Sequence, residues 1–280
     1  GVTGVQTCAL PIWNQKATYY ALRPDMTKPE FIKEVLTGLV APPAYFPKNV
    51  VMNIKGYESI DEVLDRGKTT FNVQEFELVA NETQALVLDT RSASQFAEGF
   101  IPNSINIGLD SNFAMWVGEM IPDINQEILL VTEAGKEEES ITRLARVGYD
   151  NSIGHLGGGF ESWKNAGKPY ETVERINAET FAQQFDQKMV FDVRKKSEFD
   201  SEHITTAINI PLNEINQHLS EIPKDQPFII YCGSGYRTMI AASILKQRGW
   251  DNFVDVIGGF KAIAQTDVPR TEYVCPTTLL

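Results

Sequence analysis

Short apolar runs alternate with amphipathic segments along the second half of the chain. Four of these runs have the length of strands, and the run Phe228–Tyr231 is apolar at every position, which is typical of a strand buried on both faces. Residues 238–248 then place apolar side chains on neighbouring faces of a helix that ends at Gly249. Alternating strands and helices predict an α/β fold with a parallel sheet flanked by helices. The four runs are 189–193, 207–210, 228–231 and 253–257.

This pattern occurs twice in the chain. Residues 89–107 align with 192–210, and eight of the 19 aligned positions are identical. Residues 148–151 similarly match 249–252, and each match precedes a glycine cluster and a phenylalanine. A repeat of this length indicates two tandem domains rather than a solenoid. We predict a first domain over 69–170, a second over 171–266, a tail over 267–280 and a linker over 14–68. Residues 1–13 lack the basic residues of a signal peptide, and we interpret them as a non-native leader.

Composition and charge exclude several classes of partner. The 280 residues carry a formal net charge of −12, which argues against a nucleic-acid partner. No apolar run approaches the roughly 20 residues of a membrane span. The three cysteines, Cys8, Cys232 and Cys275, are too few and too far apart for a disulfide framework, which favours a reducing compartment such as the cytoplasm. The three histidines lack the spacing of metal ligands, so we expect no metal site.

One cysteine directly follows the buried run Phe228–Tyr231 and precedes the predicted helix. The six residues from Cys232 to Arg237 include two glycines and end on the arginine. The helix dipole and the arginine both favour a thiolate, and the glycines let backbone N–H groups turn toward an anion. A cysteine that only packs would need neither. We therefore predict Cys232 and Arg237 as catalytic, with a substrate-binding loop of Gly233, Ser234, Gly235 and Tyr236.

The first repeat lacks this chemistry. Its matching strand, Ile128–Val131, is followed by Thr132 and by a segment with four glutamates, which would repel an anion. We predict a structural or docking role for this unit.

Together these motifs resemble the rhodanese family. The resemblance rests on the motifs D-x-R and A-I-N-I, on an apolar strand leading into C-x-x-G-x-R, and on G-W-D-N before G-G-F. In that family the loop cysteine carries sulfane sulfur as a persulfide. The resemblance implies a sulfurtransferase that moves sulfane sulfur from thiosulfate or a low-molecular-weight persulfide to a thiol or cyanide through Cys232. Four residues separate Cys232 from Arg237, whereas the related phosphatases and arsenate reductases have five, so a phosphatase is disfavoured. Gly233 and Ser234 resemble the loop of mercaptopyruvate-type enzymes, which leaves the donor open.

Three further residues are candidates for support of the site. Arg194 either faces the substrate or forms a charge pair with Asp192; because Asp89 and Arg91 recur in the unit without a cysteine, we favour the pair. His203 matches the family's histidine before isoleucine. We interpret it as a loop-packing residue, with a base as the alternative.

Residues 22–56 and 109–118 resemble parts of fusions between a metallo-β-lactamase-fold persulfide dioxygenase and rhodanese domains. The iron-binding motif H-x-H-x-D-H of those fusions is absent here, so we expect no cofactor in this chain, and iron would belong to a missing upstream domain. The implied partners are sulfur donors, thiol acceptors and possible contact with such a dioxygenase domain. The alternative function is a docking or regulatory pair that serves the dioxygenase and moves little sulfur itself. Cys275 is either an inert exposed thiol or a resolving thiol that receives sulfur from Cys232.

Overall fold

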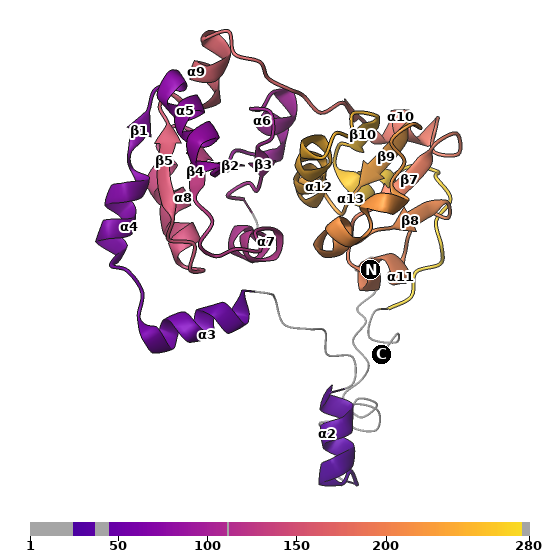
Figure 1. The fold of residues 1–280 in the computed structure, drawn as a ribbon. Helices are drawn as coiled ribbons and strands as arrows, with labels where there is room; N and C mark the ends of the chain where they lie inside the picture. Colours follow the sequence, from indigo (N-terminus) through magenta and orange to yellow (C-terminus); the bar gives the residue numbers. More distant parts are fainter. Residues whose placement is uncertain (1–24, 37–44, 111, 276–280) are drawn as a thin grey trace, which may run out of the picture.

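The computed structural model describes residues 25–36, 45–110 and 112–275, so the predicted leader over 1–13 lies outside the described residues. These residues form two α/β units, each built on a five-stranded parallel sheet (Figure 1). The tandem architecture expected from the sequence repeat is therefore confirmed. Before the first unit come two helices, α2 (Lys28–Leu36) and α3 (Phe46–Lys55), neither of which buries a side chain fully.

The strands of the first unit follow the spatial order β1-β5-β4-β2-β3, and every pairing is parallel. Helices α5 and α6 begin at capping boxes: the Asn72 and Ser92 side chains each accept an N–H from three residues on, and Glu75 and Gln95 return the bond. The elements are α4 (Ile60–Gly67), β1 (Thr70–Phe71), α5 (Val73–Thr83), β2 (Leu86–Asp89), α6 (Ala93–Glu98), β3 (Ile105–Asn106), α7 (Phe113–Met120), β4 (Ile128–Val131), α8 (Glu137–Ala145), β5 (Ser152–Leu156) and α9 (Gly159–Asn165).

The second unit repeats this order as β6-β10-β9-β7-β8, again with parallel pairings. Four of its five strands match the predicted runs to within one residue, β6 was not predicted, and the helix after β9 begins two residues earlier than predicted. The elements are β6 (Arg175–Ile176), α10 (Ala178–Ala182), β7 (Met189–Asp192), α11 (Lys196–Ser201), β8 (Ala207–Asn209), the 3₁₀ helices η2 (Leu212–Gln217) and η3 (Leu219–Glu221), β9 (Phe228–Tyr231), α12 (Tyr236–Gln247), β10 (Phe253–Val256) and α13 (Gly259–Ile263).

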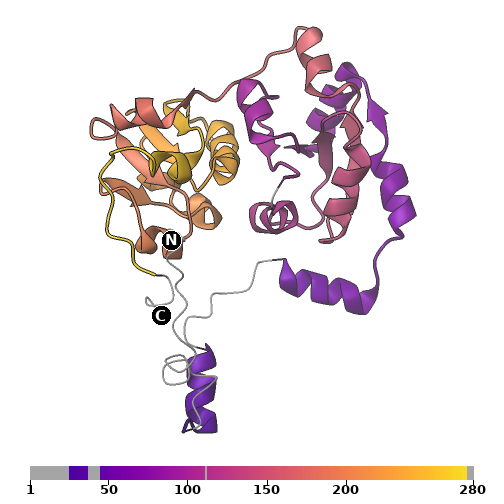
Figure 2. The same ribbon diagram turned by 180° about the vertical axis from the view of Figure 1, so that it is seen from behind.

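Helix α12 lies between the two units (Figures 1 and 2). It packs against β10 and η2 of its own unit and against β3 and α6 of the first unit. All residues from Thr238 to Leu245 are buried, which explains why the sequence shows apolar residues on more than one face of this helix. One hydrophobic core runs without interruption from Ile105 and Ile107 of the first unit to Ile240 and Ile244 of α12.

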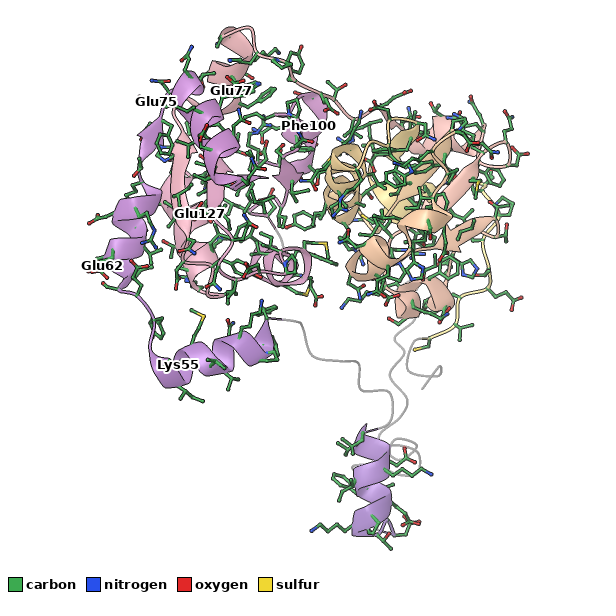
Figure 3. All side chains as sticks on the ribbon, in the orientation of Figure 1. Lys55, Glu62, Glu75, Glu77, Phe100 and Glu127 are labelled. Carbon is green, nitrogen blue, oxygen red and sulfur yellow. The ribbon has the colours of Figure 1, made fainter. Side chains whose placement is uncertain are left out.

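Hydrogen bonds join the units along the same helix. The Asn106 backbone N–H donates to Ser243 Oγ at 3.0 Å, and Gln247 Nε2 donates to the carbonyl of Asn103 at 3.1 Å. Phe100, labelled in Figure 3, pairs its backbone with Glu171 in the segment that leads into the second unit. The second unit is thus braced by the first.

No helix within the described ranges is long and apolar enough to cross a membrane.

Candidate active site

Cys232 lies at the carboxyl end of β9, the central strand of the second sheet. Strand β9 pairs with β7 on one side and β10 on the other, so the cysteine occupies the place where ligand sites of parallel sheets form. All four residues of β9 are buried, and Cys232 itself is only 1% exposed. The strand therefore fixes the sulfur in a defined position under the loop that follows.

Two backbone N–H groups point at the sulfur. Gly235 donates to Cys232 Sγ at 3.2 Å and Thr238 at 3.4 Å. Gly235 is the N-cap of α12 and has φ of +100°, a conformation that glycine adopts without strain. Because this N-cap has no side chain, Sγ takes the acceptor role that a serine or aspartate usually plays for the third N–H of a helix. The arrangement stabilises negative charge on sulfur.

One of these donors lies outside the predicted substrate-binding loop. Gly235 belongs to that loop, whereas Thr238 lies beyond it. Ser234 is exposed and Gly233 is half-buried, so this part of the loop forms its open side.

The other side of the loop rests on the start of α13. The Phe260 N–H donates to the carbonyl of Cys232 at 2.6 Å, and the Lys261 N–H donates to that of Gly233 at 3.1 Å. Gly259 has φ of +55°, and a Cβ there would lie 2.2 Å from the Cys232 carbonyl oxygen. The Gly258–Phe260 segment therefore forms the expected tight turn after a strand, and it also contacts the cysteine loop, which the sequence did not indicate.

Arg237 binds Glu198 of α11. Its Nη1 donates to Oε2 at 2.5 Å and its Nη2 to Oε1 at 2.9 Å. Burial lowers the pKa of Arg237, but the hydrogen bonds and charge of Glu198 outweigh this and raise it; the charge of Cys232 acts in the same direction. Burial likewise raises the pKa of Glu198, but the bonds to Arg237 prevail and lower it. The predicted catalytic cation is thus held in a two-point ion pair.

The residues predicted to support the site form buried or stacked contacts of their own. Arg194 Nη2 donates to Asp192 Oδ2 at 2.6 Å, and both side chains are buried. The Arg194 guanidinium also lies 3.9 Å from the centre of the Phe260 ring. His203 stacks on Phe199 at 3.7 Å, and its Nδ1 lies 2.6 Å from the Phe199 carbonyl oxygen, which makes Nδ1 the protonated nitrogen. This is the geometry that a loop-packing role requires.

Tyr236 links the loop to the first unit. Its hydroxyl donates to the carbonyl of Gly108 at 2.8 Å. Burial, and next the charge of Asp110, raise the pKa of this phenol. Tyr236 was predicted to bind substrate, and the structure shows its hydroxyl engaged in a contact between units.

A second ion pair near the loop was missed from the sequence. Arg175 Nε donates to the buried Asp255 Oδ2 at 2.9 Å. A Cβ on Gly235 would lie 3.7 Å from Arg175 Nη2. Burial raises the pKa of Asp255 to about 6, against the lowering effect of Arg175. The two residues lie opposite each other in the paired strands β6 and β10, and no local motif marks them.

The first unit preserves the framework without the nucleophile. Asp89 and Arg91 form the same buried pair, and Arg91 lies 4.4 Å from the centre of the Phe160 ring. Thr132 takes the place of Cys232, beside an open depression of about 460 Å³. The prediction that all four glutamates lie in a loop needs correction. Three of them lie in the first turn of α8, where the helix dipole favours acidic residues.

Cys275 departs from both sequence interpretations. It is disulfide-bonded in the structure, which the three widely spaced cysteines did not lead us to expect. Within the described residues, Cys232 is a free thiol.

Comparisons with known proteins show which family both units match. Residues 72–166 and 177–266 each match the family of rhodanese-like domains. The protein YqhL of Bacillus subtilis is 34% identical over 89 residues, which are 32% of this chain and 71% of that protein. A sulfurtransferase of Allochromatium vinosum is 32% identical over 100 residues, 35% of this chain and 94% of that protein. A solved rhodanese-related protein from Thermoplasma volcanium is 30% identical with a TM-score of 0.33, covering 35% of this chain and 97% of that one.

These matches do not support the resemblance to a dioxygenase fusion. They cover both repeats over more than half of the chain, and the repeats share one sheet order. The chain belongs to the family of rhodanese-like domains, of which it carries two.

Proposed function

We propose that this protein is a sulfurtransferase that carries sulfane sulfur on Cys232. The observation that supports this most directly is the sulfur itself, which sits under a helix N-terminus and accepts N–H bonds from Gly235 and Thr238. The name of the Allochromatium vinosum relative, a sulfurtransferase, points the same way.

The reaction proceeds in two displacements. In the first, the Cys232 thiolate attacks the outer sulfur of the donor, and the donor's bond to that sulfur breaks, releasing sulfite or a thiolate. The new persulfide carries its charge next to the N–H groups of the loop, which stabilise it as an oxyanion hole stabilises oxygen. In the second, an acceptor thiol or cyanide attacks the outer sulfur and restores the thiolate. Because Ser234 is the exposed part of the loop, we place the approach of both substrates there.

Intact-protein and peptide mass spectrometry test this proposal. The protein is incubated with thiosulfate or glutathione persulfide and then with cyanide. We expect one added sulfur on the Cys232 peptide, its removal by cyanide, and thiocyanate release. Cys232→Ser abolishes both, whereas Thr132→Ser, at the equivalent position of the first unit, leaves both unchanged.

If the wild-type protein takes up sulfur from neither donor, the proposal is wrong. A docking or regulatory pair that moves little sulfur itself then becomes the leading function.

A further inference from the structure

We propose that Glu198 makes the Cys232 loop select donors by charge, so that persulfides are used in preference to the dianion thiosulfate. This inference rests on the proposed sulfur transfer, and it names the donor class of that same site. Glu198 acts as a specificity-determining residue through the cation that it binds.

Glu198 occupies the hydrogen-bonding groups that an anionic donor would need. Both terminal nitrogens of Arg237 donate to its carboxylate. A Cβ on Gly233 would lie 3.0 Å from Arg237 Nη2, so the guanidinium lies alongside the open part of the loop. The Arg237 side chain is 18% exposed and that of Glu198 is 39% exposed. To bind Arg237, the sulfonate group of thiosulfate would therefore have to displace the Glu198 carboxylate from its two hydrogen bonds.

The other arginines around the loop offer no substitute cation. Each is held by a buried carboxylate within the described part of the chain. The two pairs are Arg194 with Asp192 and Arg175 with Asp255. The three arginines and the three carboxylates that they bind balance one another, so the thiolate leaves a net negative charge among these groups, and the helix N-terminus is what favours a further anion.

The two donors differ in the charge that they bring to this place. Thiosulfate reacts as a dianion. The Cys232 thiolate bonds to its outer sulfur and the S–S bond breaks, so that a persulfide anion remains on Cys232 and a sulfite dianion leaves. Three negative charges are present before and after this step. A protonated persulfide, R–S–SH, reacts with one negative charge in total and yields R–S⁻ and Cys232–S–SH. The carboxylates of glutathione lie far from its reacting sulfur. Repulsion therefore penalises thiosulfate far more than a persulfide.

The first unit shows that this pair accompanies the nucleophile. The repeat aligns Glu198 with Gln95 and Arg237 with Glu137. Gln95 forms only the capping box of α6 with Ser92. The capping position is thus common to both units, but the carboxylate and the arginine it binds occur together only beside Cys232.

Steady-state kinetics with two donors test the inference. Loading of Cys232 is measured with thiosulfate and with glutathione persulfide for the wild type, Glu198→Gln and the matched control Glu179→Gln, which removes an exposed glutamate from the first turn of α10. We expect the wild type to favour the persulfide by more than about tenfold in kcat/KM. Glu198→Gln raises kcat/KM for thiosulfate by about tenfold, the effect of one unit charge at close range, and changes that for the persulfide by less than about threefold. Glu179→Gln leaves both unchanged.

Three outcomes would overturn the inference while leaving sulfur transfer intact. A wild type that favours thiosulfate contradicts it without any variant. An unchanged donor ratio in Glu198→Gln contradicts it, and so does an equal fall for both donors, which would mean that Glu198 only positions Arg237. Raising the ionic strength should also increase the thiosulfate rate more steeply for the Glu179→Gln control than for Glu198→Gln. A protein that takes up sulfur from neither donor instead refutes the proposed function.

Discussion

Replacement of Gly259 by alanine tests whether the start of α13 holds the cysteine loop in place. The added Cβ would lie 2.2 Å from the Cys232 carbonyl oxygen and 2.9 Å from the Ser234 nitrogen. Both are backbone atoms, so a side-chain rotation cannot relieve the contact. The loop or α13 must move by roughly an ångström to restore van der Waals contact, and this movement disturbs the hydrogen bond from Phe260 to Cys232.

The magnitude follows from two contributions. The left-handed backbone of Gly259, with φ of +55°, destabilises a residue with a Cβ by about 1 to 2 kcal/mol, and overpacking adds about 1 to 3 kcal/mol. We therefore expect Gly259→Ala to lower the free energy of unfolding by about 2 to 5 kcal/mol. A shift of this size at the reacting sulfur should also slow sulfur loading about 100-fold.

Substitutions at two other glycines separate the loss of stability from the loss of activity. Gly249 has φ of +85° and nothing within 4 Å of its would-be Cβ, so Gly249→Ala should show the backbone contribution alone and keep its activity. Gly159 is the counterpart of Gly259 in the first unit, with a Cβ position 2.9 Å from the Thr132 carbonyl oxygen. Gly159→Ala should lose stability but not activity.

Urea unfolding gives the stability of each variant, and mass spectrometry gives the rate at which folded protein loads sulfur on Cys232. The reasoning is refuted if folded Gly259→Ala loads sulfur at the wild-type rate, or if Gly159→Ala is slowed as much.

Two further predictions concern the surroundings of the loop. Tyr236→Phe removes the bond to the Gly108 carbonyl and should lower the free energy of unfolding by about 1 kcal/mol, measured in urea; no change would show that the contact contributes nothing. Asp255 has a pKa raised by burial from 3.8 to about 6, so the folded state keeps its proton where the unfolded state has lost it. The free energy of unfolding should therefore fall by roughly 2 kcal/mol between pH 4 and pH 6 from this group, and Asp255→Asn, compared with the wild type across that range, should lack this part of the slope; parallel pH profiles would contradict the assignment.

The strands and the position of Cys232 were predictable because they depend on local patterns. Phe228–Tyr231 is apolar throughout, and the glycines after it signal a loop, so the end of a central strand could be placed from the sequence. Because the two repeats share one sequence pattern, the same sheet order could be expected in both units.

The contacts around the cysteine were not predictable in the same way. Glu198 lies far from Arg237 in the sequence, and their contact depends on how the tertiary fold brings α11 to the start of α12. Gly259 belongs to the glycine cluster that recurs in both repeats, yet its closeness to the Cys232 carbonyl depends on the spacing of β9 and β10. Thr238 was missed because its contribution is a backbone N–H, which the side chain does not reveal.

The uninterrupted core through α12 has a consequence for how such a duplicated chain can change. The first unit has no cysteine, but it packs against α12, the helix whose N-terminus faces Cys232. If the first unit were removed, the apolar residues of α12 that pack on β3 and α6 would be exposed to water. Selection for a stable second unit therefore also preserves the first unit, which forms part of its neighbour's core.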